Sequence, residues 1–283
     1  MNEYHYRLLN VFAIAGDRLS GNPLCVFEAA RDLDERTMQA LARQFNLSET
    51  TFILPSTRAT ARVRIFTPAF ELPFAGHPTL GTAHIVRQLS GRAQCEITLE
   101  TAAGVIPVSA DGDRWTLQAN APTSRPLAAS RSQLAEMLSL TPDDIAATPL
   151  WVNTGTEHLV VPLTSADAVQ RCAPLLSLLG EHARVNAHRH LVYVWASAGG
   201  DNIRARFFFS KGNALAEDPA TGSACANLGG WFIATGASLP LRRRVHQGDQ
   251  VGRPSLLGLS VDERRRIYVS GEVIELGDGR VRL

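Results

Sequence analysis

The sequence has no excess charge of either sign. Its 283 residues hold 28 Lys and Arg against 27 Asp and Glu, which gives a formal net charge of +1 at pH 7. Proteins that bind nucleic acids or anionic membrane surfaces concentrate positive charge. We therefore expect neither a nucleic acid nor a membrane among the partners of this protein.

Long apolar runs are also missing. No stretch approaches the roughly 20 apolar residues that a membrane-spanning helix needs. The first residues, Met1 to His5, are polar and lack the apolar core of a signal peptide. With 45% hydrophobic and 19% charged residues, the composition is typical of a globular protein with one large core or two of ordinary size. A cytoplasmic location is the expectation.

Cysteine is scarce, and its spacing excludes the usual cysteine motifs. The four cysteines, at positions 25, 95, 172 and 225, are too far apart for a Cys-x-x-Cys metal or redox motif. No His-Glu-x-x-His motif occurs either, so we predict no bound metal; His188 and His190, which flank one arginine, are a weaker alternative. Since Gly-x-Gly-x-x-Gly and Walker loops are absent too, we predict no nucleotide or other cofactor.

The chain does contain a seven-residue motif that occurs twice. Residues His77–Ala83 reappear as Asp218–Ala224, at an offset of 222 − 81 = 141 residues, about half of the chain. A basic stretch precedes each copy, Arg62–Phe66 and Arg204–Phe208. Self-similarity at a fixed offset indicates duplicated architecture. We therefore predict two related domains, in which His77 and Asp218 occupy equivalent places just before a helix.

Each copy of the motif has the composition of a helix start. The first turn of a helix has unpaired N–H groups and a partial positive charge, and small residues leave room for an approaching anion. Ser223 adds a hydroxyl group to the second start. We predict that the two starts face one cleft between the domains and hold a small carboxylate. The alternative is that proline followed by threonine or serine simply begins a helix; the duplication favours the ligand.

The order of the predicted elements favours an α+β fold. Apolar periodicity predicts helices over 34–46, 78–89 and 220–234, and the short strands between them do not alternate strictly with helices. Residues 120–126 have the composition of a linker. The prediction is an N-terminal domain over 1–119 and a C-terminal domain over 120–283, and it leaves open whether the C-terminal strand completes the first domain.

Three ionisable residues are candidates for proton transfer. Glu49 lies in a polar turn between an amphipathic helix and an apolar strand, where partial burial raises a carboxyl pKa toward neutrality. His77 and Asp218 are placed by the repeat at the two helix starts. Each residue also has a structural alternative: Glu49 as an exposed turn residue, His77 as a packed loop residue, and Asp218 as the cap of the next helix.

A two-cysteine racemase is a further alternative. That mechanism needs a thiol at each helix start, and Cys225 directly follows the second copy of the motif. Its counterpart at the 141-residue offset is His84, so the second thiol is missing.

Several long motifs resemble those of the phenazine-biosynthesis PhzF family, and together they cover nearly the whole chain. They are Gly21-Asn22-Pro23, Met38-Gln39-Ala40 through Phe45-Asn46-Leu47-Ser48-Glu49-Thr50-Thr51-Phe52, Phe66-Thr67-Pro68, Glu71-Leu72-Pro73-Phe74-Ala75-Gly76-His77-Pro78-Thr79, Glu217-Asp218-Pro219-Ala220-Thr221-Gly222-Ser223-Ala224, and Gln247-Gly248 with Gly252-Arg253-Pro254-Ser255.

The resemblance implies a diaminopimelate-epimerase-like fold of two pseudo-symmetric domains, each a β-barrel-like sheet around a central helix. It also implies a cofactor-free isomerase with Glu49 as the acid/base. By the same resemblance, a set of residues from two motifs binds and polarises the substrate, and Asn22 matches the family's Gly-Asn-Pro asparagine. The set comprises Gly76, His77, Asp218, Gly222 and Ser223.

The function predicted from the sequence is therefore a cytoplasmic, cofactor-independent isomerase that moves a proton on a small carboxylate-bearing substrate. A homodimer is the assembly considered. Two other functions stay open: a non-catalytic member that binds a metabolite or protein in the same cleft, and an epimerase or racemase of an amino-acid derivative. Intact Glu49, His77 and Asp218 favour catalysis, because a pure binder has no need of an acid/base carboxylate.

Overall fold

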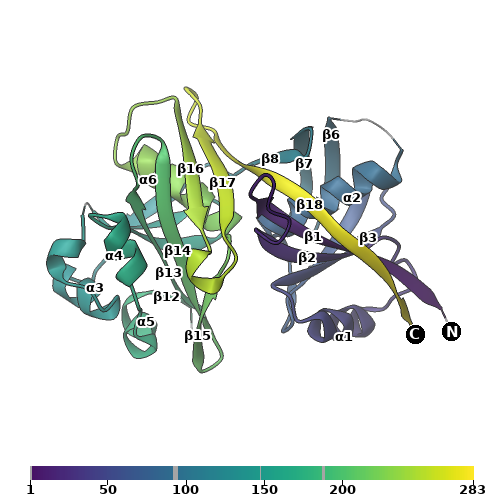
Figure 1. Ribbon diagram of the computed structural model, residues 1–283, viewed down its shortest axis with the longest axis horizontal. Coiled ribbons are helices and arrows are strands. Elements are labelled where there is room, and N and C mark those ends of the chain that lie inside the picture. The colour runs from purple at the N-terminus through teal and green to yellow at the C-terminus, as the bar shows by residue number, and fades with distance from the viewer. Residues whose placement is uncertain (1, 92–94, 147, 187–188) are drawn as a thin grey trace. The chain divides into compact units, whose positions relative to one another are not determined.

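The computed structural model describes residues 2–91, 95–146, 148–186 and 189–283 (Figure 1). The chain divides into two compact units. The first unit comprises residues 1–118 together with 270–283, and the second comprises 119–269. The place of the C-terminal strand, open from the sequence, is therefore with the first unit.

The strands of the first unit form a closed barrel. Their bounds are β1 Glu3–Ala13, β2 Asn22–Phe27, β3 Glu49–Leu54, β4 Ala61–Phe66, β5 Glu71–Leu72, β6 Glu96–Thr101, β7 Gly104–Asp111, β8 Arg114–Gln118 and β18 Ile267–Arg282. Hydrogen bonding runs in the order β8, β7, β6, β4, β3, β2, β1, β18 and back to β8. The pairs β2–β3 and β4–β6 are parallel. β18 closes the barrel, because it pairs with β1 along one edge and with β8 along the other.

Helix α2, Gly76–Leu89, lies within this barrel. Every residue from His77 to Val86 is buried, as expected for a helix surrounded by sheet. Gly81 makes the close approach possible, since a Cβ atom there would lie 2.5 Å from Leu24 Cδ2. The strands contacted by α2 are β1, β2, β3, β4, β6 and β8.

Helix α1, Glu35–Phe45, packs on β3 and β4 with one apolar face. Asp34 caps its start by accepting a hydrogen bond from the backbone N–H of Thr37 at 2.8 Å. Asn46, with φ of +51°, ends it in the left-handed conformation that asparagine tolerates. Periodicity and caps together explain why the sequence predicted this helix correctly.

The second unit repeats the topology with longer insertions. Its strands are β9 Thr123–Pro126, β10 Leu150–Asn153, β11 Glu157–Pro162, β12 Arg184–Asn186, β13 Arg189–Ser197, β14 Asn202–Lys211, β15 Ala214–Asp218, β16 Leu241–Gln247 and β17 Ser255–Val261. Its helices are α3 Arg131–Met137, α4 Ala166–Arg171, α5 Leu176–His182 and α6 Gly222–Ala234, with 3₁₀ turns η1 Pro142–Asp144 and η2 Asp249–Val251.

The pairing pattern is the same in both units. β1–β2 is antiparallel, β2–β3 parallel, β3–β4 antiparallel and β4–β6 parallel. The series β10, β11, β13, β14 and β16 has the same four relations in the same order. α6 takes the place of α2, with its residues buried from Ala224 to Ile233 against β9, β10, β11 and β17. The predicted α+β fold, with a sheet around a central helix in each half, is confirmed.

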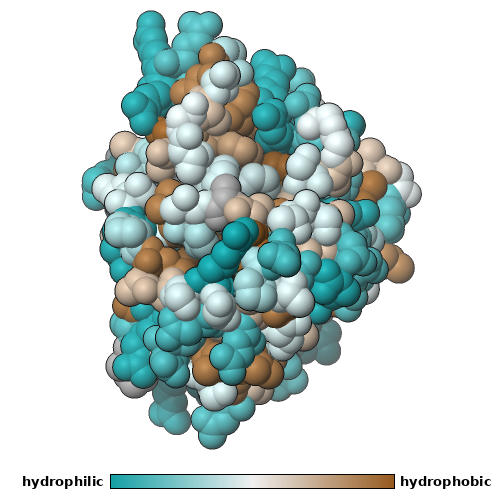
Figure 2. All heavy atoms as spheres, turned by 90° about the vertical axis from the view of Figure 1, so that its left-hand side faces the viewer, coloured by the Kyte–Doolittle hydropathy of each residue, from teal (hydrophilic) through white to brown (hydrophobic). Residues whose placement is uncertain are grey.

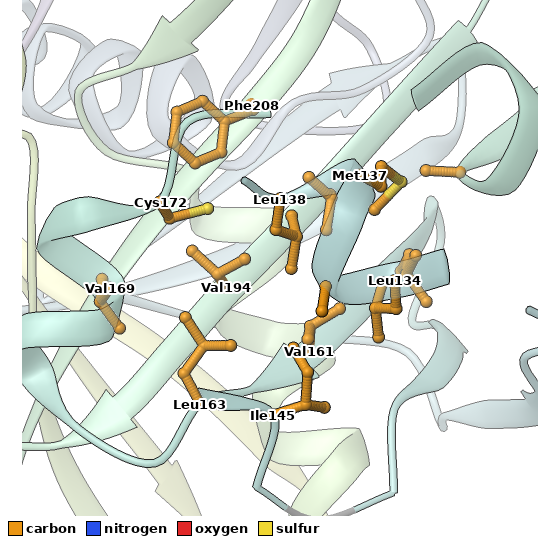
Figure 3. Close-up of a cluster of buried hydrophobic side chains, with 14 of the residues drawn as sticks. Leu134, Met137, Leu138, Ile145, Val161, Leu163, Val169, Cys172, Val194 and Phe208 are labelled. Atoms are coloured by element: carbon orange, nitrogen blue, oxygen red, sulfur yellow. The ribbon is translucent and has the colours of Figure 1, made fainter. Parts of the chain in front are cut away.

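The outer helices of the second unit cover an apolar cluster (Figure 3). It joins α3, which lies between β9 and β10, and α4 and α5, which lie between β11 and β13, to the strands β11 and β13. Two separate insertions therefore share one core. Figure 2 shows hydrophilic and hydrophobic side chains interspersed on one face of the molecule. The labelled members of the cluster are Leu134, Met137, Leu138, Ile145, Val161, Leu163, Val169, Cys172, Val194 and Phe208.

The predicted register of the internal repeat is wrong by five residues. The central helices begin at Gly76 and Gly222, an offset of 222 − 76 = 146 rather than 141. The strand pairing agrees, because Phe66 lies opposite Glu71 and Phe208 opposite Glu217, which are also 217 − 71 = 146 apart.

The reason is a hairpin of different length. Five positions separate Phe66 from Glu71, whereas nine separate Phe208 from Glu217. The structural counterpart of His77 is therefore Ser223, and that of Asp218 is Leu72. The predicted equivalence of His77 and Asp218 is wrong, because Pro78-Thr79-Leu80-Gly81 lies inside α2, whereas Pro219-Ala220-Thr221 precedes α6.

Candidate active site

Three of the candidate residues meet at one end of the first barrel. Asn22 is the first residue of β2, and Glu49 is the first residue of β3. These strands are parallel neighbours, with Leu24 opposite Glu49, so their starts lie at the same end of the sheet. His77 is the second residue of α2, and its Nδ1 lies 3.3 Å from Glu49 Oε2. The helix start and both strand starts thus converge.

His77 is neutral at physiological pH. Burial lowers the pKa of His77 to about 4, and a hydrogen bond with the backbone of Pro23 opposes this only in part. Proline has no N–H, so the carbonyl of Pro23 accepts and the imidazole donates. His77 Nε2 is buried and has no hydrogen-bond partner among the described residues. The donor is therefore Nδ1, and Nε2 carries a lone pair available to a hydrogen-bond donor.

Glu49 stands beside this neutral ring and is partly buried. Its side chain is 16% exposed, whereas that of His77 is 6% exposed. The alternative of an exposed turn glutamate is thus wrong, since Glu49 is the first residue of strand β3. A carboxylate next to a neutral imidazole and half-shielded from water can take a proton from carbon acids more readily than one in bulk water.

The start of α2 has open backbone donors. The N-cap residue is Ala75, which has no side-chain group to bond the first turn, and no acidic residue lies in that turn. Pro78 has no N–H, and the N–H of Thr79 bonds to the carbonyl of Ala75 at 3.3 Å. The N–H groups of Gly76 and His77 have no acceptor within the helix, so they are the donors that an anion at this helix start can use.

The candidate residues of the second unit gather around the start of α6. Asp218 is the last residue of β15, and Gly222 and Ser223 are the first two of α6. The N-cap residue of the helix is Thr221, and its side chain makes no cap hydrogen bond. The alternative that Asp218 serves as the N-cap is therefore wrong; its Oδ2 instead accepts a hydrogen bond from Thr221 Oγ1 at 2.6 Å.

Gln247 is a residue that the sequence did not single out. Its Nε2 donates to the carbonyl of Asp218 at 2.8 Å and to Thr221 Oγ1 at 3.0 Å. Gly248 packs beside it with φ of +87°, and a Cβ atom there would lie 2.5 Å from the carbonyl oxygen of Pro219. The available signal was the Gln-Gly pair of the last motif, but nothing local relates it to a loop about 30 residues earlier.

The duplicated basic strands brace the loops that lead to both helix starts. Arg64 makes a two-point ion pair with Glu71 and lies over the ring of Phe66 at 5.0 Å. Arg206 pairs in the same manner with Glu217, at 3.0 and 2.7 Å, and lies over the ring of Phe208 at 4.5 Å. Both arginines thus tie a central strand to the short strand before the helix.

Two alternatives from the sequence, a metal site and a two-cysteine racemase, can be compared with the positions of their residues. Among residues 2–91, 95–146, 148–186 and 189–283, no three His, Cys, Asp or Glu side chains are grouped as metal ligands. His188 lies outside the described residues. Burial raises the pKa of the Cys225 thiol, which disfavours the thiolate that a racemase needs. His84 is occupied within the core, since its Nδ1 accepts from Trp115 Nε1 at 3.2 Å.

The described part of the chain contains no helix with the length and apolar character required to cross a bilayer.

Comparison with known proteins places the chain among isomerases. The family described as PhzC-PhzF, phenazine biosynthesis-like protein, matches residues 10–279. An uncharacterised isomerase of Pasteurella multocida is 39% identical over 285 residues, which cover 99% of this chain and 95% of that protein. The trans-2,3-dihydro-3-hydroxyanthranilate isomerase of Pseudomonas fluorescens is 33% identical over 98% of this chain and 99% of its own length.

Solved structures share the fold over the whole chain. A PhzF-family phenazine biosynthesis protein of Bacillus anthracis superposes with a TM-score of 0.86 at 23% identity and covers 100% of both chains. A hydroxyproline epimerase of Agrobacterium vitis superposes with a TM-score of 0.65 at 13% identity, covering 99% of this chain and 93% of its own. The predicted epimerase-like fold is thereby confirmed.

Proposed function

Because the chain belongs to the PhzC-PhzF family of phenazine biosynthesis-like proteins, we propose that it is a cofactor-independent isomerase with Glu49 as its acid/base. The reaction class is movement of a proton within a small carboxylate-bearing molecule. The observation that carries this proposal is the contact between Glu49 and the neutral, buried His77 at an uncapped helix start.

In the proposed reaction, Glu49 takes a proton from one carbon of the substrate and returns it to another. One C–H bond breaks and one forms, so the reaction is redox-neutral and needs no co-reactant. His77 cannot store the proton at pH 7, since its pKa is about 4. Its role is to accept, through Nε2, a hydrogen bond from an O–H or N–H group of the substrate and thus orient the reacting carbon above Glu49.

The substrate carboxylate is assigned to the helix starts. We propose that the N–H groups of Gly76 and His77, with those of Gly222 and Ser223, serve one site between the two units. Open N–H groups and the positive helix end favour a negative charge in each unit taken by itself. Asn22 and Asp218 complete the proposed binding site as polar contacts to the substrate.

An epimerase with two acid/base groups is the less favoured candidate. Glu49 lies opposite Leu24, the third residue of β2. In the second unit, Val192 lies opposite Phe208 as Thr50 lies opposite Phe66. The residue before Val192, Leu191, is therefore the counterpart of Glu49 and has no acid/base group. The topology therefore supplies one acid/base carboxylate where a symmetric two-base mechanism needs a partner, and a single base suits transfer between two carbons on one face.

The test uses deuterated water as the proton source. The protein is incubated in D₂O with trans-2,3-dihydro-3-hydroxyanthranilate and a panel of cyclic and amino-acid carboxylates, and label uptake is read by mass spectrometry. Glu49→Gln should lower the exchange rate by about 10²-fold or more, in line with loss of a general base. Glu96→Gln is the matched control, because Glu96 also begins a strand but is exposed.

Full exchange activity in Glu49→Gln would overturn the acid/base assignment. Tight binding of a carboxylate with no label uptake from any compound in the panel would instead favour the non-catalytic binding function. The homodimer and the cytoplasmic location remain proposals, to be checked by light scattering and by fractionation of the native cell.

A further inference from the structure

We propose that Thr221 and Gln247 form a hydrogen-bonded relay that positions the carboxylate of Asp218 and keeps it ionised. They are positioning residues, since neither is placed against the substrate. The catalytic part of this inference rests on the proposed function, in which Asp218 belongs to the binding site. The structural part concerns the second unit alone.

The relay is directional. Gln247 Nε2 donates to Thr221 Oγ1 at 3.0 Å, and Thr221 Oγ1 donates to Asp218 Oδ2 at 2.6 Å. A hydroxyl group has a single proton. Because one side of the Thr221 oxygen already accepts from the amide, its proton is directed to the carboxylate. The chain of donors therefore points from Gln247 to Asp218.

The orientation of the Gln247 amide follows from its second contact. The same Nε2 donates to the backbone carbonyl of Asp218 at 2.8 Å. A carbonyl oxygen only accepts, so the flipped amide would place two acceptors against each other. The amide nitrogen thus holds both the backbone of Asp218 and the hydroxyl that binds its side chain.

The buried position of the Gln247 side chain has an energetic cost. The residue is 1% exposed, and its Oε1 is buried without a hydrogen-bond partner in the described part of the chain. An unsatisfied buried acceptor is unfavourable, and an apolar side chain of the same size avoids it. A local penalty of this kind is expected where a residue serves a site rather than the core. The amide is therefore retained for its contacts with residues 218 and 221.

The neighbouring turn fixes the distance between the relay and the loop. A Cβ atom on Gly248 would lie 2.2 Å from the carbonyl oxygen of Arg253 and 2.5 Å from that of Pro219. Only glycine fits there, so the turn after β16 packs directly against the residue that follows Asp218. The nearby charged side chains of β15 and η2 are already paired, Glu217 with Arg206 and Asp249 with Arg204.

The experiment follows the carboxyl carbon of Asp218 by NMR through a pH titration, using protein with ¹³C-labelled aspartate and Asp218→Asn for assignment. A donor to the charged form lowers a carboxyl pKa. We expect Thr221→Val to raise the titration midpoint of Asp218 by about half a pH unit or more. Thr221→Ser should restore it, and Gln247→Met should raise it by a smaller amount because the hydroxyl becomes free to rotate.

Matched controls use the same substitutions away from the relay. Thr235→Val removes a hydroxyl that donates to the carbonyl of Trp231 at the other end of α6, and Gln250→Met changes an exposed amide three residues from Gln247. Neither should move the midpoint. Thr221→Ala repeats the measurement with a smaller side chain if the valine variant does not fold.

An unchanged midpoint in Thr221→Val, or a serine variant that fails to restore it, overturns the relay. The activity arm measures deuterium exchange on the compound that labels best in the panel: both relay variants should lower kcat by about tenfold with a smaller change in KM. If Asp218→Asn keeps full exchange while the midpoint moves, the relay stands and the assigned role of Asp218 fails. If Asp218→Asn is inactive and Thr221→Val leaves the titration midpoint of Asp218 unchanged, Asp218 keeps its assigned role and the relay fails.

Discussion

At the scale of single residues, burial decides the chemistry of the candidate site. The sequence placed Glu49 and His77 in the same motif set but gave no charge state for either. The structure puts the imidazole of His77 in a position where its pKa falls to about 4, so the ring is an acceptor rather than a cation. The burial that causes this comes from residues distant in sequence, which is why local sequence could not reveal it.

The protonation of His77 leads to a prediction about stability at acid pH. Its folded pKa, about 4, lies below the value near 6.5 of an unfolded histidine. Between these values the unfolded chain binds a proton that the folded chain does not, so stability falls as pH drops below about 6.5. His77→Gln should therefore lose about 2 kcal/mol less than the parent protein between pH 7 and pH 5.

Urea unfolding at the two pH values measures this difference. Burial also lowers the pKa of His158, to about 3, so the parent protein and the variant both retain that second source of acid sensitivity. His5→Gln, at an exposed position of β1, is the control for the substitution itself. Parallel curves for the parent and His77→Gln would show that folding leaves the pKa of His77 unchanged, which contradicts the prediction.

At the scale of elements, two contacts decide how each central helix sits in its barrel. One is the two-point Arg–Glu pair before the helix, present in both units. The other is a glycine where helix and strand approach closely, Gly81 in α2 against β2. The sequence predicted the helices from their small residues and periodicity. It misaligned the repeat because the extra hairpin residues between β14 and β15 shift every later position.

The Arg–Glu pairs should differ in their contribution to stability. The side chains of Arg206 and Glu217 are 13% and 9% exposed, and Arg206 Nη1 also donates to the carbonyl of Cys172 at 2.6 Å. The side chains of Arg64 and Glu71 are 19% and 31% exposed. Because removing one partner of a buried pair leaves an uncompensated charge, Arg206→Met should lower the free energy of unfolding by about 3–5 kcal/mol.

Arg64→Met should cost less, about 1–2 kcal/mol, since water solvates the remaining Glu71 in part. Arg125→Met is the control: Arg125 also makes a two-point pair, with Glu157, but its side chain is 51% exposed. Chemical denaturation of the three variants gives the order directly. A larger loss for Arg64→Met than for Arg206→Met would contradict the burial argument.

The close contact at Gly81 predicts that alanine destabilises the protein there, whereas a glycine with free space around it should tolerate alanine. A Cβ atom on Gly81 would lie 2.5 Å from Leu24 Cδ2 and 2.9 Å from Val11 Cγ2, so Gly81→Ala should destabilise the first unit by about 1–3 kcal/mol through overpacking. Gly180 in α5 has its nearest neighbour, His190 Cε1, at 3.6 Å. Gly180→Ala should therefore be neutral or stabilising by up to about 1 kcal/mol. Melting temperatures of the two variants should move in opposite directions.

At the scale of the whole molecule, the two units share a strand topology but differ in their candidate site residues. The two units share one order of strand pairs around one central helix. Yet Glu49 has Leu191 as its counterpart, and His77 has Ser223. The sequence could predict two related halves and name most candidate residues, because long motifs carry them. It could not predict which strand closes the first barrel or that Gln247 reaches Asp218, because those contacts join segments far apart in the chain.

The closing strand can be tested by truncation. β18 pairs with β1 through ten residue pairs between Glu3 and Ala13, and residues 270–283 count with the first unit. A chain ending at Val269 should leave β1 and β8 as open edges, so the first unit should lose its protection against amide hydrogen exchange while the second unit retains it. A chain lacking only Leu283 is the control. Equal protection in the truncated and full chains would show that β18 is dispensable.

The same strand has a consequence for synthesis on the ribosome. Residues 1–118 emerge first, but the segment that seals their barrel begins at residue 270, 270 − 118 = 152 residues later. At roughly 5–20 residues per second, translation leaves the first unit unsealed for about 8 to 30 s. During that interval β1 and β8 are available to wrong partners. The nascent chain therefore has a defined period of vulnerability, in which a holding chaperone or a slow pause site would act on the first half rather than on the second.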